Sequence, residues 1–404
     1  MGNEPFEHLY SREARTQQPS AIREICHLAG QPDIRSLAGG WPDPEILPNK
    51  ETAEIFSELA KDDPACLLQY GTTEGLKDLK EQICSFYKDS EGLSLKCEEL
   101  LIIHGAQQGM DLLSRILIEP GDIVFAGLPT YFGGTGAMQS RGAEIIGVPV
   151  DEDGLNVEQM KISLKELKAA KPEANIKGIY VIPNFQNPTG ATLSLKRRKH
   201  LLALADEYDF LIFEDDPYGE LRFEDQAIAS LRKLDTKERV IHIRSLSKTF
   251  SPGVRVAWMT AEKSLIRKMV VSKQFVDSCT NSLGQHIASE FIKKGYLKKQ
   301  IAKNIEFYSK KRDRVLELLD RHFPATVKYN RPSGGFFIFV HLPENISAND
   351  LLQKAKGQKV VFVSGSPFFI DHSGENTFRI SYSQVSYEDM EAAVKVLGEI
   401  LHKL

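Results

Sequence analysis

Short apolar runs alternate with helix-length segments along the chain from about residue 100 onward. The alternation predicts seven β-strands, at residues 101–104, 123–126, 144–150, 178–182, 210–214, 240–244 and 254–259. Strands separated mostly by helices indicate a largely parallel sheet with helices on both faces. We therefore expect an α/β fold whose ligands bind at the carboxyl ends of the strands.

The pattern changes after residue 260. Helical stretches rich in Lys and Glu run to about residue 323, and the short β-like pieces SGGFFIFV and KVVFVSG follow. This shift predicts a large domain at 51–295 and a smaller α+β domain at 296–404. We expect the segment 1–50 to join the small domain and cover the pocket, with an amphipathic helix at 21–28.

Composition and charge narrow the function classes. The 404 residues are 26% charged with a net charge of -4, so nothing favours a nucleic-acid partner. No apolar run approaches the roughly 18 residues of a membrane span, and the N-terminus lacks the apolar stretch of a signal peptide. We predict a cytoplasmic protein. Five scattered cysteines without a CxxC pair predict free thiols at Cys26, Cys66, Cys84, Cys97 and Cys279.

A lysine stands between two predicted strands, in the segment SLSKTFSPG. A partly buried amine loses proton affinity and can react with a carbonyl group, which makes Lys248 a candidate for imine chemistry. A snorkelling surface lysine is the alternative. Ser245 and Arg255 lie on either side of it, and Pro252 and Gly253 predict a turn between the strands.

Polar groups follow three other predicted strands. In HGAQQGMD a helix begins after Gly105, and its N-terminal N–H groups favour a phosphate, although a tight turn gives the same pattern. In FEDDPYGE, Glu214, Asp215 and Asp216 suit a metal, acid–base chemistry or a ligand cation, or form an acidic loop. No histidine cluster supports a metal. In NFQNPTG, a rigid turn either presents the Asn187 amide to a ligand or is no more than a turn, and the bond to Pro188 is either cis or trans.

Together with SLAGGWPDPE, YGTTEG and FRISYS, these segments resemble the class I and II aminotransferases, which are fold type I enzymes that use pyridoxal 5'-phosphate. The resemblance covers nearly the whole chain, and the nearest subgroup contains the 2-aminoadipate and kynurenine aminotransferases. It implies a mostly parallel seven-stranded sheet in the large domain. It also implies a homodimer with shared active sites.

The resemblance assigns Lys248, Asp215 and Tyr218 to catalysis. Lys248 would hold the cofactor and then move the proton at the substrate's α-carbon. Asp215 would keep the ring nitrogen protonated, and Tyr218 and Asn187 would reach the ring hydroxyl. Tyr131 would stack on the ring.

Other matched positions would bind the phosphate and the substrate. The phosphate ligands implied are Ala106, Gln107, Ser245, Arg255 and Tyr70, the last from a second subunit. Many relatives have a hydroxyl residue in place of Ala106, so one side-chain hydrogen bond to the phosphate is expected to be absent.

The resemblance also implies substrate-binding residues: Arg379 for the α-carboxylate, Asn187, Gly39 for close backbone approach, and Arg23. Arg23 is either a ligand for a distal acidic group or a solvated helix charge. Trp41 would equally suit an aromatic substrate.

These assignments predict transfer of an amino group from a 2-aminoadipate-type, aromatic or branched-chain amino acid to a 2-oxo acid. We expect 2-oxoglutarate as the acceptor, in a ping-pong route. The same residues could serve a lyase of this fold, because the pocket decides which reaction takes place once the α-proton is removed. A regulator that senses amino acids is a further alternative, but residues 1–35 are too few for a winged helix.

Overall fold

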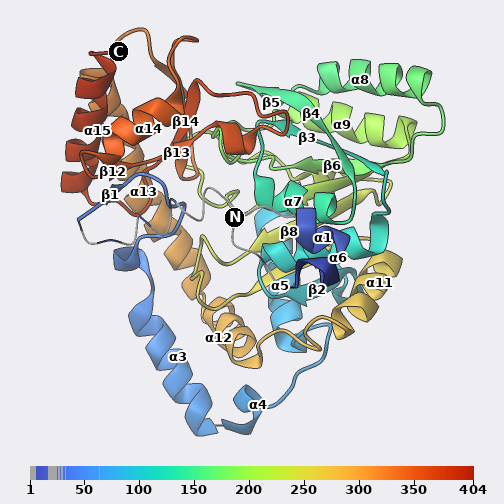
Figure 1. The fold of residues 1–404 in the computed structure, drawn as a ribbon. Coiled ribbons are helices and arrows are strands. Elements are labelled where there is room, and N and C mark those ends of the chain that lie inside the picture. The colour runs from blue at the N-terminus through green and yellow to red at the C-terminus, as the bar shows by residue number, and fades with distance from the viewer. Residues whose placement is uncertain (1–5, 17–24, 26–27, 29–30, 32, 63) are drawn as a thin grey trace.

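The computed structural model describes residues 6–16, 25, 28, 31, 33–62 and 64–404. Most of them form an α/β body with one large sheet, and the C-terminal residues form a second, smaller body beside it (Figure 1). Arg23 and Cys26 lie outside the described residues, as does most of the predicted helix at 21–28. No helix in the described ranges is long and apolar enough to cross a membrane. The cytoplasmic location stays a prediction.

The large sheet has eight strands in the order β2-β9-β8-β7-β6-β3-β4-β5. Their bounds are β2 Leu100–Ile103, β3 Ile123–Leu128, β4 Glu144–Asp151, β5 Gly154–Leu155, β6 Ile176–Val181, β7 Leu211–Asp215, β8 Val240–Ser245 and β9 Ala257–Thr260. The five central strands β8, β7, β6, β3 and β4 are parallel, whereas β9 and β5 run antiparallel to their neighbours. All seven predicted strands are present. The eighth, β5, was not predicted because two residues show no periodicity.

Helices cover both faces of this sheet, as the alternation predicts (Figure 1). One apolar core joins the sheet to α6 Ala106–Leu117, α7 Phe132–Ser140 and α11 Lys263–Gln274. A second core, on the other face, joins it to α8 Val157–Ala170, α9 Leu195–Glu207 and α10 Leu231–Leu234. A third lies at the β2 edge against α3 Asn49–Asp62, α5 Lys77–Glu91 and α12 Ser282–Lys293. Because both faces are buried, the strands are apolar almost throughout.

The C-terminal body begins with the long helix α13, Tyr296–His322. Its four-stranded antiparallel sheet has the order β10-β11-β14-β13, with bounds Lys328–Tyr329, Phe337–His341, Thr377–Ser381 and Val363–Ser364. Helices α14 Ala348–Lys356 and α15 Tyr387–Leu401 pack on it. β1, Arg35–Ser36, pairs in parallel with β12, Val360–Val361. A piece of the N-terminal segment is thus part of the C-terminal body, and the predicted boundaries 1–50, 51–295 and 296–404 stay predictions.

The remaining elements are short or peripheral. They are η1 Glu7–Leu9, α1 Arg12–Thr16, η2 Pro44–Ile46, α4 Pro64–Leu68, η3 Cys97–Glu99 and η4 Ser366–Phe368. Figure 1 shows α3 and α4 extending from the body at one edge. Cys84 and Cys97, distant in sequence, bring their sulfur atoms to 4.0 Å without forming a disulfide.

Candidate active site

A cavity of about 270 Å³ lies where the carboxyl ends of β7 and β8 face the C-terminal body. Most of the predicted site residues line it: Ala106, Gln107, Tyr131, Asn187, Asp215, Tyr218, Ser245, Lys248, Arg255 and Arg379. The parallel order of the strands explains this convergence, because it places the residues that follow each strand at one edge. The cavity also contains Trp41, Ser247 and Phe337, for which we predicted no contact with the cofactor.

Lys248 extends into this cavity from the turn after β8. Its amine donates a hydrogen bond to the Gly40 carbonyl oxygen at 2.7 Å. Burial lowers the lysine's pKa to about 8, and the positive charges of Arg379 and Arg255 act in the same direction. The amine therefore loses its proton more readily than an ordinary lysine, and the neutral form is the one that acts as a nucleophile. The surface-lysine alternative is wrong.

Asp215 ends β7 and is 6% exposed. Burial raises the pKa of this carboxyl to about 7, opposed first by a hydrogen bond from Tyr180 and more weakly by the charge of Lys248. The Tyr180 hydroxyl donates to Oδ2 at 2.8 Å. Oδ1 is buried and has no hydrogen-bond partner among the described residues. A buried carboxylate oxygen left without a donor is costly unless a ligand supplies one.

The N-terminus of α6 lines the cavity and is suited to bind an anion. Gly105 precedes it with φ of 81°, and a Cβ there would lie 2.1 Å from Nη2 of Arg255. Only glycine lets the arginine approach this closely. Ser245 donates to the Ser247 hydroxyl at 2.9 Å, and both serines line the cavity. The helix N–H groups and the guanidinium together suit a phosphate.

Arg379, in β14, closes the cavity from the C-terminal body. Its guanidinium stacks on the Phe337 ring at 4.2 Å and donates to the Asn187 amide oxygen at 2.7 Å and to the Ala38 carbonyl oxygen at 2.6 Å. Asn187 thereby links the large sheet to the arginine, a contact that we did not predict. The peptide bond from Asn187 to Pro188 is cis, one of the two possibilities left open.

Two of the predicted residues that the structure describes, Tyr70 and Gly39, do not line the cavity. Tyr70, after α4, is 83% exposed. Gly39 is buried, and a Cβ on it would lie 2.7 Å from the Trp41 ring, while its neighbour Gly40 lines the cavity instead. Arg23 lies outside the described residues.

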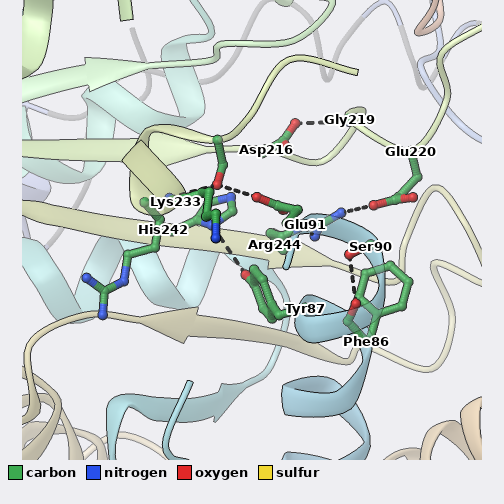
Figure 2. Close-up of polar contacts among 12 residues, drawn as sticks. Phe86, Tyr87, Ser90, Glu91, Asp216, Gly219, Glu220, Lys233, His242 and Arg244 are labelled. Carbon is green, nitrogen blue, oxygen red and sulfur yellow. Dashed lines mark hydrogen bonds and ion pairs between the residues drawn. The ribbon is translucent and has the colours of Figure 1, made fainter. Parts of the chain in front are cut away.

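A buried charge network anchors the loop after β7. Arg244, near the end of β8, is 4% exposed and pairs with Glu220, while its Nη1 lies 3.4 Å from Oε1 of Glu91 (Figure 2). Removing either carboxylate would be destabilising, because it would leave the buried guanidinium with one partner fewer. The loop that carries Tyr218 is therefore tied to the strand that leads to Lys248. No sequence pattern indicates this network, because its members come from α5, β8 and the loop.

The residues present fit pyridoxal 5'-phosphate. The orphaned Oδ1 of Asp215 is an acceptor for a protonated ring nitrogen, the α6 N-terminus with Arg255 suits the phosphate, and Lys248 is an amine of lowered pKa in the same cavity. No group of three or more residues suited to hold a metal ion occurs in the part of the chain that the structure describes.

Comparisons with known proteins agree with this fit. The family model described as aminotransferase class I and II matches residues 47–397. The chain is 38% identical to aromatic-amino-acid aminotransferase 1 of Thermococcus litoralis, over 98% of this chain and 94% of that protein. It is 35% identical to the 2-aminoadipate transaminase of Thermus thermophilus, over 99% and 98%. The crystal structure of Pyrococcus horikoshii kynurenine aminotransferase, in complex with PMP, superimposes with a TM-score of 0.95 at 37% identity, over 99% and 98%.

Proposed function

The chain belongs to the class I and II aminotransferases, and from this membership we propose which residues perform the reaction and which amino acids they select. The protein is a fold type I enzyme that uses pyridoxal phosphate to move an amino group from an amino acid to a 2-oxo acid. One observation supports the residue assignment above the others. An amine of lowered pKa and a buried, half-satisfied carboxylate line the same cavity.

Some residues of the chain would bind the cofactor, and Lys248 would transfer the proton. Asp215 would hold the ring nitrogen, and the α6 N-terminus with Arg255 and Ser245 would hold the phosphate. The bound cofactor supplies an electron sink that makes the α-proton of an amino acid removable. The Lys248 amine would take that proton as a base and return it as an acid.

Arg379 would orient the substrate. Its stacking on Phe337 and its bond to Asn187 hold the guanidinium in one plane, and a planar fork suits a carboxylate. The substrate's α-carboxylate bound there would bring the α-carbon toward Lys248, which lines the same cavity. Tyr218 and Asn187 remain the residues proposed for the ring hydroxyl.

The lining of the cavity supports aromatic and other apolar donors. Among the described residues, its cations are Lys248, Arg255 and Arg379, each with a role above, and the rest of the lining includes Trp41 and Ile182. A distal carboxylate, as in 2-aminoadipate, would then depend on Arg23. We infer that the described part of the site takes apolar donors and that Arg23 adds acidic ones.

A half-reaction panel tests this inference. The loaded enzyme is mixed with kynurenine, phenylalanine, leucine, glutamate and 2-aminoadipate, and the rate of change of the cofactor's absorbance is measured. Arg23→Ala should slow the two acidic donors about tenfold or more and leave the apolar donors unchanged, because one ion pair to the distal group is lost. Arg15→Ala, at an exposed arginine that precedes Arg23 in the sequence, is the matched control. Equal losses for all five donors would show that Arg23 does not select side chains.

The same mixtures of loaded enzyme and amino donor distinguish an aminotransferase reaction from a lyase reaction. An aminotransferase given a donor and no acceptor yields one equivalent of 2-oxo acid per site and then stops until 2-oxoglutarate is added. A lyase would release ammonia continuously.

We infer a homodimer from the exposed residues at the edge of the body. Tyr70, Leu68 and Phe275 are 83%, 86% and 87% exposed, which is unusual for large apolar side chains and typical of an interface. A second copy covering them would carry Tyr70 to its partner's phosphate site. Mixing inactive Lys248→Ala chains with impaired Tyr70→Ala chains should restore activity, because one site of each hybrid has both residues. Two variants that stay inactive after subunit exchange would contradict a shared site.

A further inference from the structure

Tyr180 is a buried residue beside the site with no assigned role. It lies in β6, adjacent and parallel to β7, and is 0% exposed. Its hydroxyl donates to Oδ2 of Asp215 at 2.8 Å. No other side-chain hydrogen bond to that carboxylate occurs among the described residues, so the phenol alone fixes which oxygen is occupied.

The absence of a side chain at Gly134, in α7, leaves room for the phenol ring of Tyr180. A Cβ on Gly134 would lie 2.2 Å from the Tyr180 ring, so only glycine leaves room for the tyrosine. Gly134 itself lines the cavity, three residues after Tyr131. The ring therefore fills the space between β7 and the helix that presents Tyr131, and its hydroxyl has little freedom to leave Asp215.

The two oxygens of Asp215 thus have different surroundings. Oδ2 accepts a hydrogen bond from Tyr180, whereas Oδ1 has no donor among the described residues. Asp215 itself lines the cavity. We propose that Tyr180 is the positioning residue of Asp215: it holds Oδ2 so that Oδ1 is left, correctly oriented, for the cofactor's ring nitrogen. This inference rests on the proposed function and names a residue which that function did not include.

The charges around Asp215 indicate why a donor is needed there. Burial raises the pKa of the carboxyl to about 7, and the neighbouring Asp216 raises it further, while Tyr180 and then Lys248 oppose both. A hydrogen bond to the charged form favours that form. Without the Tyr180 bond the carboxyl becomes more basic, and the proton it shares with the ring nitrogen moves toward the carboxyl.

Nitrogen NMR of the loaded enzyme tests the proposal. Enzyme carrying pyridoxal phosphate labelled with ¹⁵N in the ring reports directly whether the nitrogen is protonated. We expect a protonated shift in the wild type at neutral pH, and in Tyr180→Phe a shift toward the unprotonated value, with about threefold to tenfold weaker cofactor binding. The matched control is Tyr329→Phe, which removes a tyrosine-to-aspartate hydrogen bond of 2.6 Å outside the cavity and should change neither quantity.

The outcomes separate the inference from the proposed function. If Tyr180→Phe has the wild-type ¹⁵N chemical shift and the wild-type affinity for the cofactor, the role proposed for Tyr180 is overturned and the role proposed for Asp215 is not. An unprotonated nitrogen in the wild type overturns the role proposed for Asp215. If Tyr180→Phe does not fold, site-specific 4-aminophenylalanine at position 180 keeps the packing with a weaker donor. This substitution should move the ¹⁵N chemical shift of the ring nitrogen toward the unprotonated value, but less far than Tyr180→Phe. A ¹⁵N shift equal to that of the wild type would again overturn the proposal.

Discussion

Replacing Lys248 with alanine should lower the rate of amino transfer by about 10⁴-fold, the upper end of the range for loss of a general acid–base catalyst. The structure gives the reason, because Lys248 is the only lysine that lines the cavity among the described residues. No neighbouring amine can replace it. The measurement is the single-turnover rate of the half-reaction with each amino donor, so that product release does not hide the chemical step.

Two control variants make this result specific. Lys248→Arg keeps the positive charge but cannot take up the proton at neutral pH, and should be as impaired as the alanine variant. Lys268→Ala, in α11 and outside the cavity, should be unaffected. A Lys248→Ala enzyme within about tenfold of the wild-type rate would show that another group moves the proton.

Replacing Arg379 with methionine lowers kcat/KM for amino acids by about 30-fold to 5,000-fold. Truncating one partner of a buried, hydrogen-bonded charge pair costs about 2–5 kcal/mol, and each 1.36 kcal/mol corresponds to a factor of about ten. The arginine is 3% exposed, so water cannot replace it at the substrate carboxylate. Steady-state kinetics with kynurenine and 2-oxoglutarate measure the loss.

A substrate without an α-carboxylate provides the decisive comparison. The wild type and Arg379→Met should convert a simple primary amine at similar rates, since neither can use the arginine to bind it. Arg331→Met, which removes an arginine paired with Asp320 outside the cavity, should behave as the wild type with both substrates. Equal losses for amines and amino acids would indicate a damaged site and not a lost carboxylate contact.

The large sheet was predictable because its strands are buried on both faces. Runs such as 240–243 contain mostly apolar residues, and turns or helices separate them. Lys248 and Asp215 stood out for the same reason, since each is a charged residue close to the carboxyl end of such a run. The two-residue strand β5 carries no such pattern, and its pairing with β4 depends on the turn between them.

The contacts between side chains were much less predictable. The bond from Arg379 to Asn187 joins residues 192 apart in the sequence. Tyr180 appears in the sequence as one more large residue in a buried strand, and its contact with Asp215 depends on the register between β6 and β7, which pairs Tyr180 with Phe213. For Gly39, the resemblance predicts a close approach of the backbone to the substrate, and the contact between its Cβ position and the Trp41 ring was not predictable from the sequence.

The most direct test of the account locates the cofactor on the chain. Borohydride reduction of the loaded enzyme, followed by proteolysis and mass spectrometry, identifies the residue that carries the label. We predict the mass of the reduced cofactor on the peptide that contains Lys248, and on no other peptide. Label on another buried lysine, such as Lys273 or Lys311, would contradict the central assignment.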